Sequence, residues 1–287
     1  MIAAPVLGEG SHAADIAAGR RFAFGRNWTR FLRLLDEERI VQAERSLKDM
    51  LEVERLGGFR FLDIGSGSGL FSLAARRLGA VVHSFDYDPQ SVACTSELRR
   101  RFFPDDPQWM VEQGSALDAS YLDSLGQFDV VYSWGVLHHT GQMWKALENA
   151  ARPVHPGGRL FIAIYNHQAY FSGFHTRLKR AYVAAPRVGK WIIAGAFIAF
   201  EATRGLVKDA LTLRDPAARY RAKKSSRGMS MWYDWIDWVG GYPFEVAKPE
   251  EIFDFYHSRG FELTRLATCG SGHGCNEYVF ARRTPAR

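Results

Sequence analysis

Cysteine is scarce in this chain, and the three that are present form no recognisable pattern. Cys94, Cys269 and Cys275 are too few and too scattered among 287 residues for a disulfide framework. Cys269, His273 and Cys275 are close enough in sequence to suggest a metal site, but the set lacks a fourth ligand and a paired C-x-x-C. We therefore expect neither structural disulfides nor a bound metal ion.

Long apolar runs are also missing. The longest is the ten-residue run 191–200, whereas a helix that spans a bilayer needs about 20 apolar residues. The N-terminus has no positive segment followed by an apolar one, which would mark a secretory signal. We therefore expect a cytoplasmic protein.

Charge is unevenly distributed along the chain. The formal net charge is +6, but residues 166–228 contain thirteen Lys and Arg against three Asp and Glu, so the remainder is acidic. The length allows one principal domain with an appended lobe. The basic character thus belongs to a single segment.

A glycine-rich stretch at 59–70 is the strongest local signal. Phe61, Leu62 and Ile64 supply a strand-sized apolar run, and three alternating glycines follow before a helix that begins at Leu70. This arrangement predicts a nucleotide-type site, because the helix N-terminus offers free N–H groups. The dinucleotide spacing G-x-G-x-x-G/A does not fit in either frame.

An acidic residue follows at the distance that ribose binding requires. Residues 80–85 read as a second strand that ends at Asp86, 21 residues after Gly65. A carboxylate at the tip of that strand can accept hydrogen bonds from both ribose hydroxyls. Asp88 is expected to cap the following helix, 90–101.

Two motifs carry a family resemblance. The run D-x-G-x-G-x-G from Asp63 to Gly69 resembles motif I of class I S-adenosylmethionine (SAM) dependent methyltransferases. The run S-x-G-x-L-H-H from Ser133 to His139 resembles that of small-molecule methyltransferases related to those of ubiquinone biosynthesis. The chain lacks the Asn/Asp-Pro-Pro-Tyr tetrad of enzymes that methylate amide or adenine nitrogens, and the Asp-x-x-Lys metal site of catechol enzymes is not apparent.

The resemblance covers roughly residues 59–165 and 248–287 and implies SAM as cofactor and S-adenosylhomocysteine (SAH) as product. In many relatives an acid that holds the adenine amino group stands where this chain has Ser115, so we expect its hydroxyl and the Ala116 backbone there instead. The expected cofactor-binding residues are Asp63, Gly65, Ser66, Gly67, Gly69, Asp86, Tyr87, Ser115, Ala116, Ser133 and Trp134.

The strand pattern predicts an α/β fold. Five strands with intervening helices, and two last strands joined by a short loop that must form a hairpin, indicate a Rossmann-like, seven-stranded, doubly wound sheet with an antiparallel terminal hairpin. We expect an N-terminal helical segment (1–58), whose main helix starts at Asp36 and ends at Gly57-Gly58. The core is expected at 59–165 and 248–287, with a helical insertion at 166–247.

The insertion leaves several interpretations open. The apolar run is either a buried helix that lines a substrate pocket or, with its basic neighbours, a segment that contacts a membrane surface through 187–208. Basic residues between Arg214 and Arg227 would suit an RNA backbone, but no RNA-binding module is recognisable, and a charge run is usually a solvated face. Trp232, Trp235 and Trp238 fall on one helical face and either pack the lobe onto the sheet or wall a pocket.

Candidate catalytic residues lie at strand tips and in the insertion. His139 and His167 are the leading general bases for a hydroxyl acceptor, and Asp234 lies beside the tryptophans. A structural role for His139 under the cofactor is equally compatible with the sequence. Four aromatic residues near the N-terminus either close over the cofactor or staple a helix to the sheet: Phe22, Phe24, Trp28 and Phe31.

The sequence therefore predicts a SAM-dependent methyltransferase that acts on a small, apolar or lipid-like acceptor, most readily at a hydroxyl oxygen. The alternatives are an RNA-modifying methyltransferase and a nucleotide-binding Rossmann protein without this activity. The acceptor and the oligomeric state are not determined by the residues.

Overall fold

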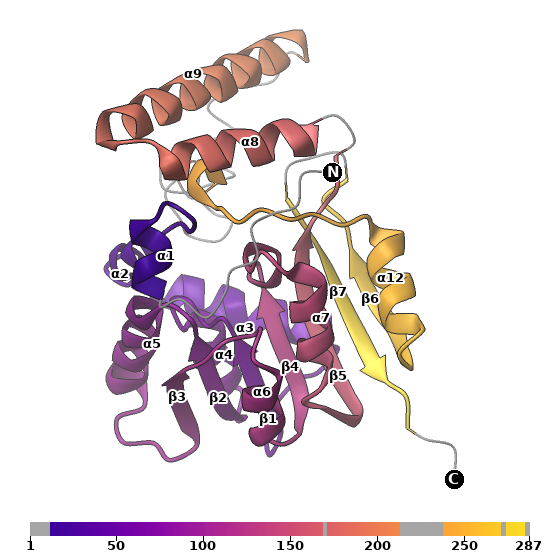
Figure 1. Ribbon diagram of the computed structural model, residues 1–287. Coiled ribbons are helices and arrows are strands. Elements are labelled where there is room, and N and C mark those ends of the chain that lie inside the picture. Colours follow the sequence, from indigo (N-terminus) through magenta and orange to yellow (C-terminus); the bar gives the residue numbers. More distant parts are fainter. Residues whose placement is uncertain (1–11, 169–170, 213–237, 271–273, 285–287) are drawn as a thin grey trace.

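The computed structural model describes residues 12–168, 171–212, 238–270 and 274–284. Their centre is one seven-stranded sheet with the order β3-β2-β1-β4-β5-β7-β6 (Figure 1). The first five of its strands run parallel, and β7 lies antiparallel between β5 and β6. The predicted α/β fold with a terminal hairpin is confirmed. The strands are β1 (Arg60–Ile64), β2 (Val81–Asp86), β3 (Trp109–Gln113), β4 (Phe128–Trp134), β5 (Val154–Tyr165), β6 (Phe261–Ala267) and β7 (Cys275–Arg282).

Helices cover both faces of the sheet, and each face has its own apolar core. One core is formed with α3, α4 and α5, and the other with α6, α7 and α12. The central strands β1, β4 and β5 are largely buried on both sides, which is why they are rich in apolar residues in the sequence. The helices of the core are α3 (Glu37–Leu51), α4 (Leu70–Arg77), α5 (Pro89–Phe102), α6 (Ala119–Ser124), α7 (Met143–Ala151) and α12 (Pro249–His257).

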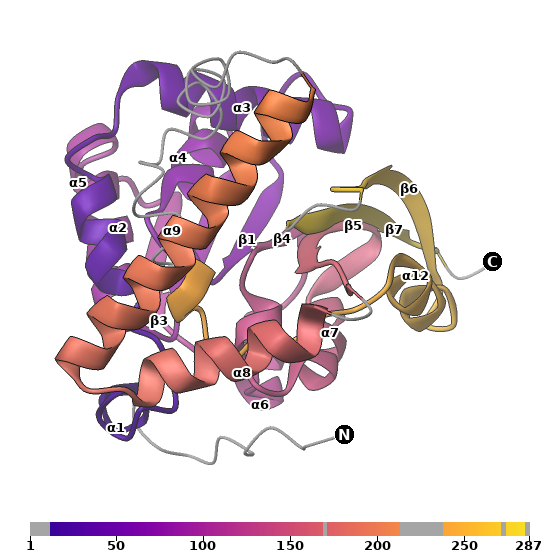
Figure 2. The same ribbon diagram turned by 90° about the horizontal axis from the view of Figure 1, so that it is seen from above.

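Four further helices lie above the carboxyl ends of the parallel strands (Figure 1). They are α1 (His12–Ala17), α2 (Gly25–Phe31), α8 (Phe171–Ala184) and α9 (Arg187–Leu211). Seen from above, α9 crosses over the core (Figure 2). Tyr182, Ala194 and Val239 form a small apolar cluster that joins α8 and α9, with Phe22 from the N-terminal segment packed against it. This upper layer covers the edge where open α/β sheets bind their ligands.

The end of α3 differs from the prediction. Asp36 caps the helix as its acidic start suggested, since its side chain accepts a hydrogen bond from the N–H of Arg39. The helix ends at Leu51 rather than at Gly57-Gly58, because Glu52 adopts a left-handed conformation (φ 52°) and its N–H bonds to Lys48 O. A non-glycine residue in that conformation gives no clear stop signal in the sequence.

Two smaller differences concern strand ends. The sequence Pro156-Gly157-Gly158 predicts a turn before the fifth strand, but β5 already begins at Val154, and its pairing with β4 is irregular between Phe128 and Val130. The run Trp109-Met110-Val111 predicts the third strand, and β3 extends beyond it to Gln113. No helix in the described ranges is both long enough and apolar enough to cross a bilayer.

Candidate active site

The glycine turn joins β1 to α4 at the carboxyl edge of the sheet. Gly65 and Gly67 both have positive φ values, 78° and 56°, which side chains rarely permit. A Cβ on Gly65 would lie 2.4 Å from the side chain of Val136, and one on Gly67 would lie 3.1 Å from the ring of Trp28. The turn therefore presents bare backbone that only glycine can provide here.

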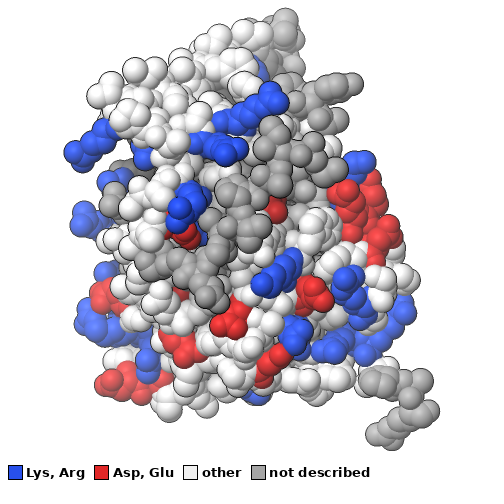
Figure 3. Space-filling model, in the orientation of Figure 1, with Lys and Arg blue, Asp and Glu red and all other residues white. Residues whose placement is uncertain are grey.

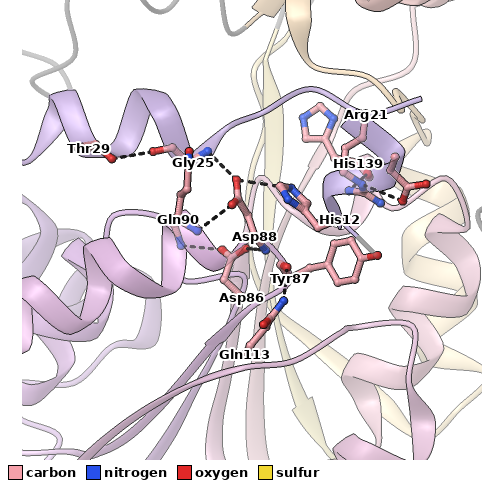
Figure 4. Close-up of polar contacts among 12 residues, drawn as sticks. His12, Arg21, Gly25, Thr29, Asp86, Tyr87, Asp88, Gln90, Gln113 and His139 are labelled. Carbon is pink, nitrogen blue, oxygen red and sulfur yellow. Dashed lines mark hydrogen bonds and ion pairs between the residues drawn. The ribbon is translucent and has the colours of Figure 1, made fainter. Parts of the chain in front are cut away.

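Asp86 braces this turn from the tip of β2. Its carboxylate accepts hydrogen bonds from the N–H of Gly67 (2.9 Å) and from the N–H of Asp88 (2.8 Å), and Figure 4 shows the second of these. Burial raises the pKa of Asp86 to about 6, although the two N–H groups and the Arg21 guanidinium oppose that rise. Asp88 caps α5 as predicted, because its side chain accepts from the N–H of Gln90.

Asp63 is buried beneath the turn rather than extended above it. Only 2% of it is exposed, and it accepts a hydrogen bond of 2.5 Å from the Ser72 hydroxyl. Ser72 is linked to Ser84, which accepts from the indole N–H of Trp109. Burial raises the pKa of Asp63 to about 7. This carboxyl thus ties β1, α4, β2 and β3 together below the site.

A cavity of about 1300 Å³ lies above the turn. Its lining combines the turns after β1, β2 and β3 with aromatic residues of the N-terminal segment and with residues of η1 (Leu137–His139), α9 and β7. Such a volume exceeds what a nucleoside alone requires. The predicted cofactor-binding residues in the lining are Asp63, Gly65, Ser66, Gly67, Asp86, Tyr87, Ser115, Ala116 and Trp134.

Gly69 and Ser133 were also predicted to bind the cofactor, but the structure places them outside this lining. Gly69 precedes α4, and its N–H donates to Ser66 O, which closes the turn. Ser133 is fully buried between strands, where its hydroxyl donates to Ile64 O. Both residues support the turn from within the fold.

Among the predicted catalytic residues, His139 lines the cavity. Its Nδ1 lies 2.6 Å from Pro243 O, and burial lowers its pKa to about 3, with Lys179 and Arg21 contributing in the same direction. His139 is therefore neutral at pH 7, and since a carbonyl oxygen can only accept, Nδ1 carries the proton. Its Nε2 is left as an acceptor.

The neighbouring His138 is more deeply buried than His139. It is fully enclosed, and its Nδ1 accepts a hydrogen bond of 3.4 Å from the N–H of Tyr165. Within the part of the chain that the structure describes, its Nε2 has no hydrogen-bond partner. Burial lowers the pKa of His138 well below its ordinary value.

Of the other two predicted catalytic residues, His167 lies in a described range and Asp234 does not. His167 follows β5 but is not part of the lining, because the N–H of His167 bonds to Ala247 O where the chain leaves the sheet. Asp234, His273 and the basic residues between Arg214 and Arg227 lie outside the described residues. The same holds for Trp232 and Trp235, whereas Trp238 lines the cavity.

Comparison with known proteins adds to this geometry. Residues 62–162 match the family described as a methyltransferase domain. The match covers 101 of the 287 residues. The match begins in β1 and ends in β5, so it includes the glycine turn, Asp86 and the run that contains His139.

The curated relatives of this chain carry the names of quinone methyltransferases. A ubiquinone biosynthesis O-methyltransferase of Parvibaculum lavamentivorans is 31% identical over 153 residues, covering 51% of this chain and 54% of the relative. A demethylmenaquinone methyltransferase of Tropheryma whipplei is 30% identical over 135 residues, covering 47% and 53%. The chain spans about half the length of the curated relatives it matches.

A solved structure shares the fold over nearly the whole chain. Magnesium protoporphyrin IX methyltransferase from Synechocystis PCC 6803, with bound SAH, superposes with a TM-score of 0.55 at 13% identity. The alignment covers 94% of this chain and 99% of that one. This likeness shows that the two chains share a fold.

Residues 12–31 cover one side of the cavity, and we call them the roof. Figure 4 shows Asp88 between His12, whose Nε2 is 3.5 Å away, and the N–H of Gly25, which donates to it at 2.8 Å. Arg21 donates to His139 O at 3.1 Å and lies 5.1 Å from the centre of the Tyr87 ring. The sequence indicated the four aromatic residues of this segment, but not the polar contacts that hold it.

The far wall of the cavity was also missed by the sequence reasoning. It includes Phe197 of α9, which stacks on Trp238 at 4.6 Å, and Cys275 and Glu277 of β7. No motif marks these residues, because they approach the site only when the insertion and the terminal hairpin fold back over the sheet. The alternation of side chains along β7 was the one signal that the sequence offered for Glu277.

Proposed function

We propose that this chain transfers a methyl group from SAM to a small, apolar or lipid-like acceptor, most readily at a hydroxyl oxygen. The observation that carries the proposal is the Asp86 carboxylate, held by the N–H groups of Gly67 and Asp88 at the rim of a cavity that continues between aromatic walls. A ribose-binding carboxylate and an acceptor pocket are thus parts of one space.

The residues of the cavity fit this cofactor. The bare backbone at Gly65 and Gly67 permits close approach of a nucleoside. Each Asp86 oxygen accepts one N–H and has a second lone pair, which leaves capacity for the ribose hydroxyls. Tyr87 and Ser115 line the same space and would border the adenine. When bound, SAM supplies a methyl group that is already activated on a sulfonium.

The protein's remaining tasks are to orient the acceptor and to exclude water. Phe22, Phe24 and Trp28 of the roof supply apolar surface above the site. His139, neutral and fixed through Pro243 O, presents Nε2 as a hydrogen-bond acceptor beside the rings of Phe24 and Tyr165. Such a group can position a hydroxyl without carrying charge.

The aromatic residues that the insertion contributes to the lining support the proposal of an apolar acceptor. Phe197 and Trp238 are stacked, and Phe22 packs against their cluster. The names of the curated relatives, which concern ubiquinone and menaquinone, are compatible with a ring-containing acceptor of this kind.

Calorimetric titration tests the cofactor assignment. We expect saturable binding of SAM and SAH, no binding of NAD, and a loss of at least about 100-fold in SAM affinity for Asp86→Ala, because two buried N–H groups and the ribose lose their acceptor. Asp123→Ala is the control, since Asp123 pairs with Arg152 on the surface. Binding of NAD without SAM would exclude the proposed cofactor.

A mass-shift screen tests the acceptor class. The protein is incubated with SAM and a panel of phenolic and prenylated compounds, and products heavier by one methyl group are sought by mass spectrometry. We expect methylation of hydroxylated rings with apolar substituents, at oxygen. Methylation of RNA with no product from the panel would favour the RNA-modifying alternative.

We further propose that α9 contacts a membrane surface that carries anionic lipid. Its outer side is apolar and exposed: Val188, Trp191 and Ile192 are each at least 66% exposed, and Phe200 is 62% exposed. Arg187 and Arg204 lie on the same helix and are exposed. Over the described parts of α8 and α9, Figure 3 shows white and blue atoms but no red ones on the face drawn.

The inner side of α9 connects this surface to the site, because Phe197 lines the cavity. An acceptor that partitions into a bilayer would thus reach the pocket beside the helix that contacts the lipid. Apolar area and basic charge together are what binding to an anionic interface requires.

Co-sedimentation with vesicles tests this contact. We expect binding to phosphatidylglycerol-containing vesicles, weaker binding to pure phosphatidylcholine, and a loss of at least about tenfold for the double variant Trp191→Ser/Ile192→Ser. Trp144→Ser on α7 removes an exposed tryptophan elsewhere and serves as the control. Equal binding of both variants to the vesicles would contradict the assignment to α9.

A further inference from the structure

Glu277 occupies a specific place in the terminal hairpin. Strand β7 runs between β5 and β6, and the register puts Glu277 directly opposite Ala163 on one side and Ala267 on the other. Both neighbours have the smallest side chain that a strand offers. The two residues paired with Glu277 across the neighbouring strands are therefore both small.

The alternation of side chains fixes the face to which Glu277 points. Glu277 shares a face with Val279, two residues on, and Val279 belongs to the apolar core that Phe161 and Tyr132 form with α3 and α4. Glu277 lies one step nearer the carboxyl edge of the parallel strands than Val279 does. That step takes it out of the core and into the cavity, which it lines together with Cys275.

The cavity on this face of the sheet has aromatic walls. Phe71 of α4 stacks on Tyr132 at 5.0 Å, and Trp134 follows at the end of β4. All three line the cavity. An acceptor that enters the cavity beside these rings meets the Glu277 carboxylate as the charged group of the β7 wall.

The other carboxylates in the lining have positions that separate them from this wall. Asp63 lies in β1, Asp86 ends β2 and Asp118 follows β3, all on the side where the cofactor is proposed to bind. Asp88 caps α5. Asp15 is bound by Arg20 in the N-terminal roof. Among the described residues of the lining, Glu277 is the carboxylate that the terminal hairpin contributes.

We propose that Glu277 accepts the hydrogen bond of the acceptor's hydroxyl and takes its proton during methyl transfer, an inference that rests on the proposed function. The oxygen–methyl bond forms as the sulfur–methyl bond breaks, which leaves SAH. The acceptor's O–H bond breaks, its proton passes to a Glu277 oxygen, and solvent receives that proton after release of the product.

Charge explains why a carboxylate suits this step better than His139 does. Methyl transfer moves a formal positive charge from the sulfonium to the acceptor oxygen, and a negative group beside that oxygen stabilises the charge as it develops. His139 has a pKa of about 3, so it is neutral and a weak proton acceptor at pH 7. His139 can position the hydroxyl, and Glu277 can compensate the positive charge that develops on the acceptor oxygen.

A chromophoric phenol tests the contact before the natural acceptor is known. The SAH complex is titrated with 4-nitrophenol across pH, because the absorbance of this probe reports its ionisation. Near an anionic carboxylate the bound phenol should resist ionisation, so its pKa should be higher than in solution. In Glu277→Gln that elevation should disappear, while SAH affinity stays within about twofold.

Glu262→Gln is the matched control, because Glu262 lies on β6 of the same hairpin and is exposed. Identical titrations for the wild type and Glu277→Gln would overturn the proposal, and so would failure of the SAH complex to bind the probe. Absence of SAH binding in the wild type is a different result, since it contradicts the proposed function itself.

Kinetics with an acceptor from the mass-shift screen gives the second readout. Glu277→Gln should lower kcat by about 100-fold or more, with the KM for SAM within about twofold, and Glu277→Asp should recover part of the loss. A kcat within about threefold of the wild type would exclude Glu277 as the proton acceptor.

Discussion

The two halves of the cavity are built in different ways. On the cofactor side, the turns after β1 and β2 are held by short backbone contacts: Gly65 and Ser66 both donate to Phe85 O, and Gly67 donates to Asp86. On the acceptor side, the contacts join distant segments, as between Arg21 and His139 O, 118 residues apart, and between His139 and Pro243 O, 104 residues apart.

This difference predicts that the two halves tolerate substitution to different degrees. The turns of the cofactor side belong to the core sheet, and substitutions there meet backbone or packed side chains. The roof and the insertion rest on that sheet through a few polar contacts and stacked rings, so their residues can change with less effect on folding. We therefore expect substitutions to affect stability on the cofactor side and binding on the acceptor side.

The largest expected effect is that of Gly65→Ala. The added methyl group would lie 2.4 Å from Val136 at a positive φ, so strain and overlap together should lower the free energy of unfolding by about 2–4 kcal/mol. Gly58→Ala is the control, since Gly58 also has a positive φ (80°) but no atom within 4 Å of the added Cβ, and should cost only about 1 kcal/mol. Urea unfolding measures both, and equal losses would show that overlap with Val136 is not decisive.

A pH-dependent effect should follow from Asp63. Burial raises its pKa in the folded state to about 7 from an ordinary 3.8, so the folded protein binds this proton more tightly than the unfolded chain does. The contribution to stability is present below about pH 4 and is lost as the pH rises towards 7, at a rate of about 1.4 kcal/mol per pH unit. Asp63→Asn should remove this part of the pH dependence in unfolding titrations, and an unchanged profile would show that the buried carboxyl does not cause it.

Trp28 tests the connection between the two halves. Its ring lies over Gly67 and lines the cavity, so Trp28→Ala should weaken SAH binding by about tenfold through loss of aromatic contact. Trp144→Ala on α7 is the control, because Trp144 is away from the lining. Calorimetry with SAH distinguishes them, and unchanged affinity in Trp28→Ala would mean that the roof covers the site without contacting the ligand.

The smallest effect on stability is expected on the outer side of α9. Ile192 is 66% exposed, so Ile192→Ser should change the free energy of unfolding by no more than about 0.5 kcal/mol. Ala194 faces inward at 5% exposure, and Ala194→Leu should destabilise by about 1–3 kcal/mol through overpacking. A large loss in Ile192→Ser would indicate that this surface contributes to folding.

Much of the fold could be predicted from local pattern alone. The bounds of strand β4 could be predicted from the sequence, because five of the seven residues from Phe128 to Trp134 are apolar and a glycine follows. Helix α5 and its cap at Asp88 followed from an acid before a proline. The end of α3 was not predictable in the same way, since Glu52 adopts its left-handed conformation without a glycine.

The residues of the site also fall into two groups, those that a local sequence pattern indicates and those that it does not. Asp86 and the glycine turn could be recognised in the sequence, because nucleoside binding requires glycines in the turn and an acidic residue about 20 positions later. Glu277, Phe197 and Arg21 carried no comparable signal, because their positions depend on how the hairpin, the insertion and the N-terminal segment pack on the sheet.

The sequence by itself determined the methyltransferase architecture and the position of the nucleoside-binding turn, because glycine conformations, strand periodicity and helix caps act over a few neighbouring residues. Only the tertiary structure decided which side chains surround the acceptor space. That space is enclosed by segments far apart in the chain, and their meeting depends on long-range packing that no short pattern encodes.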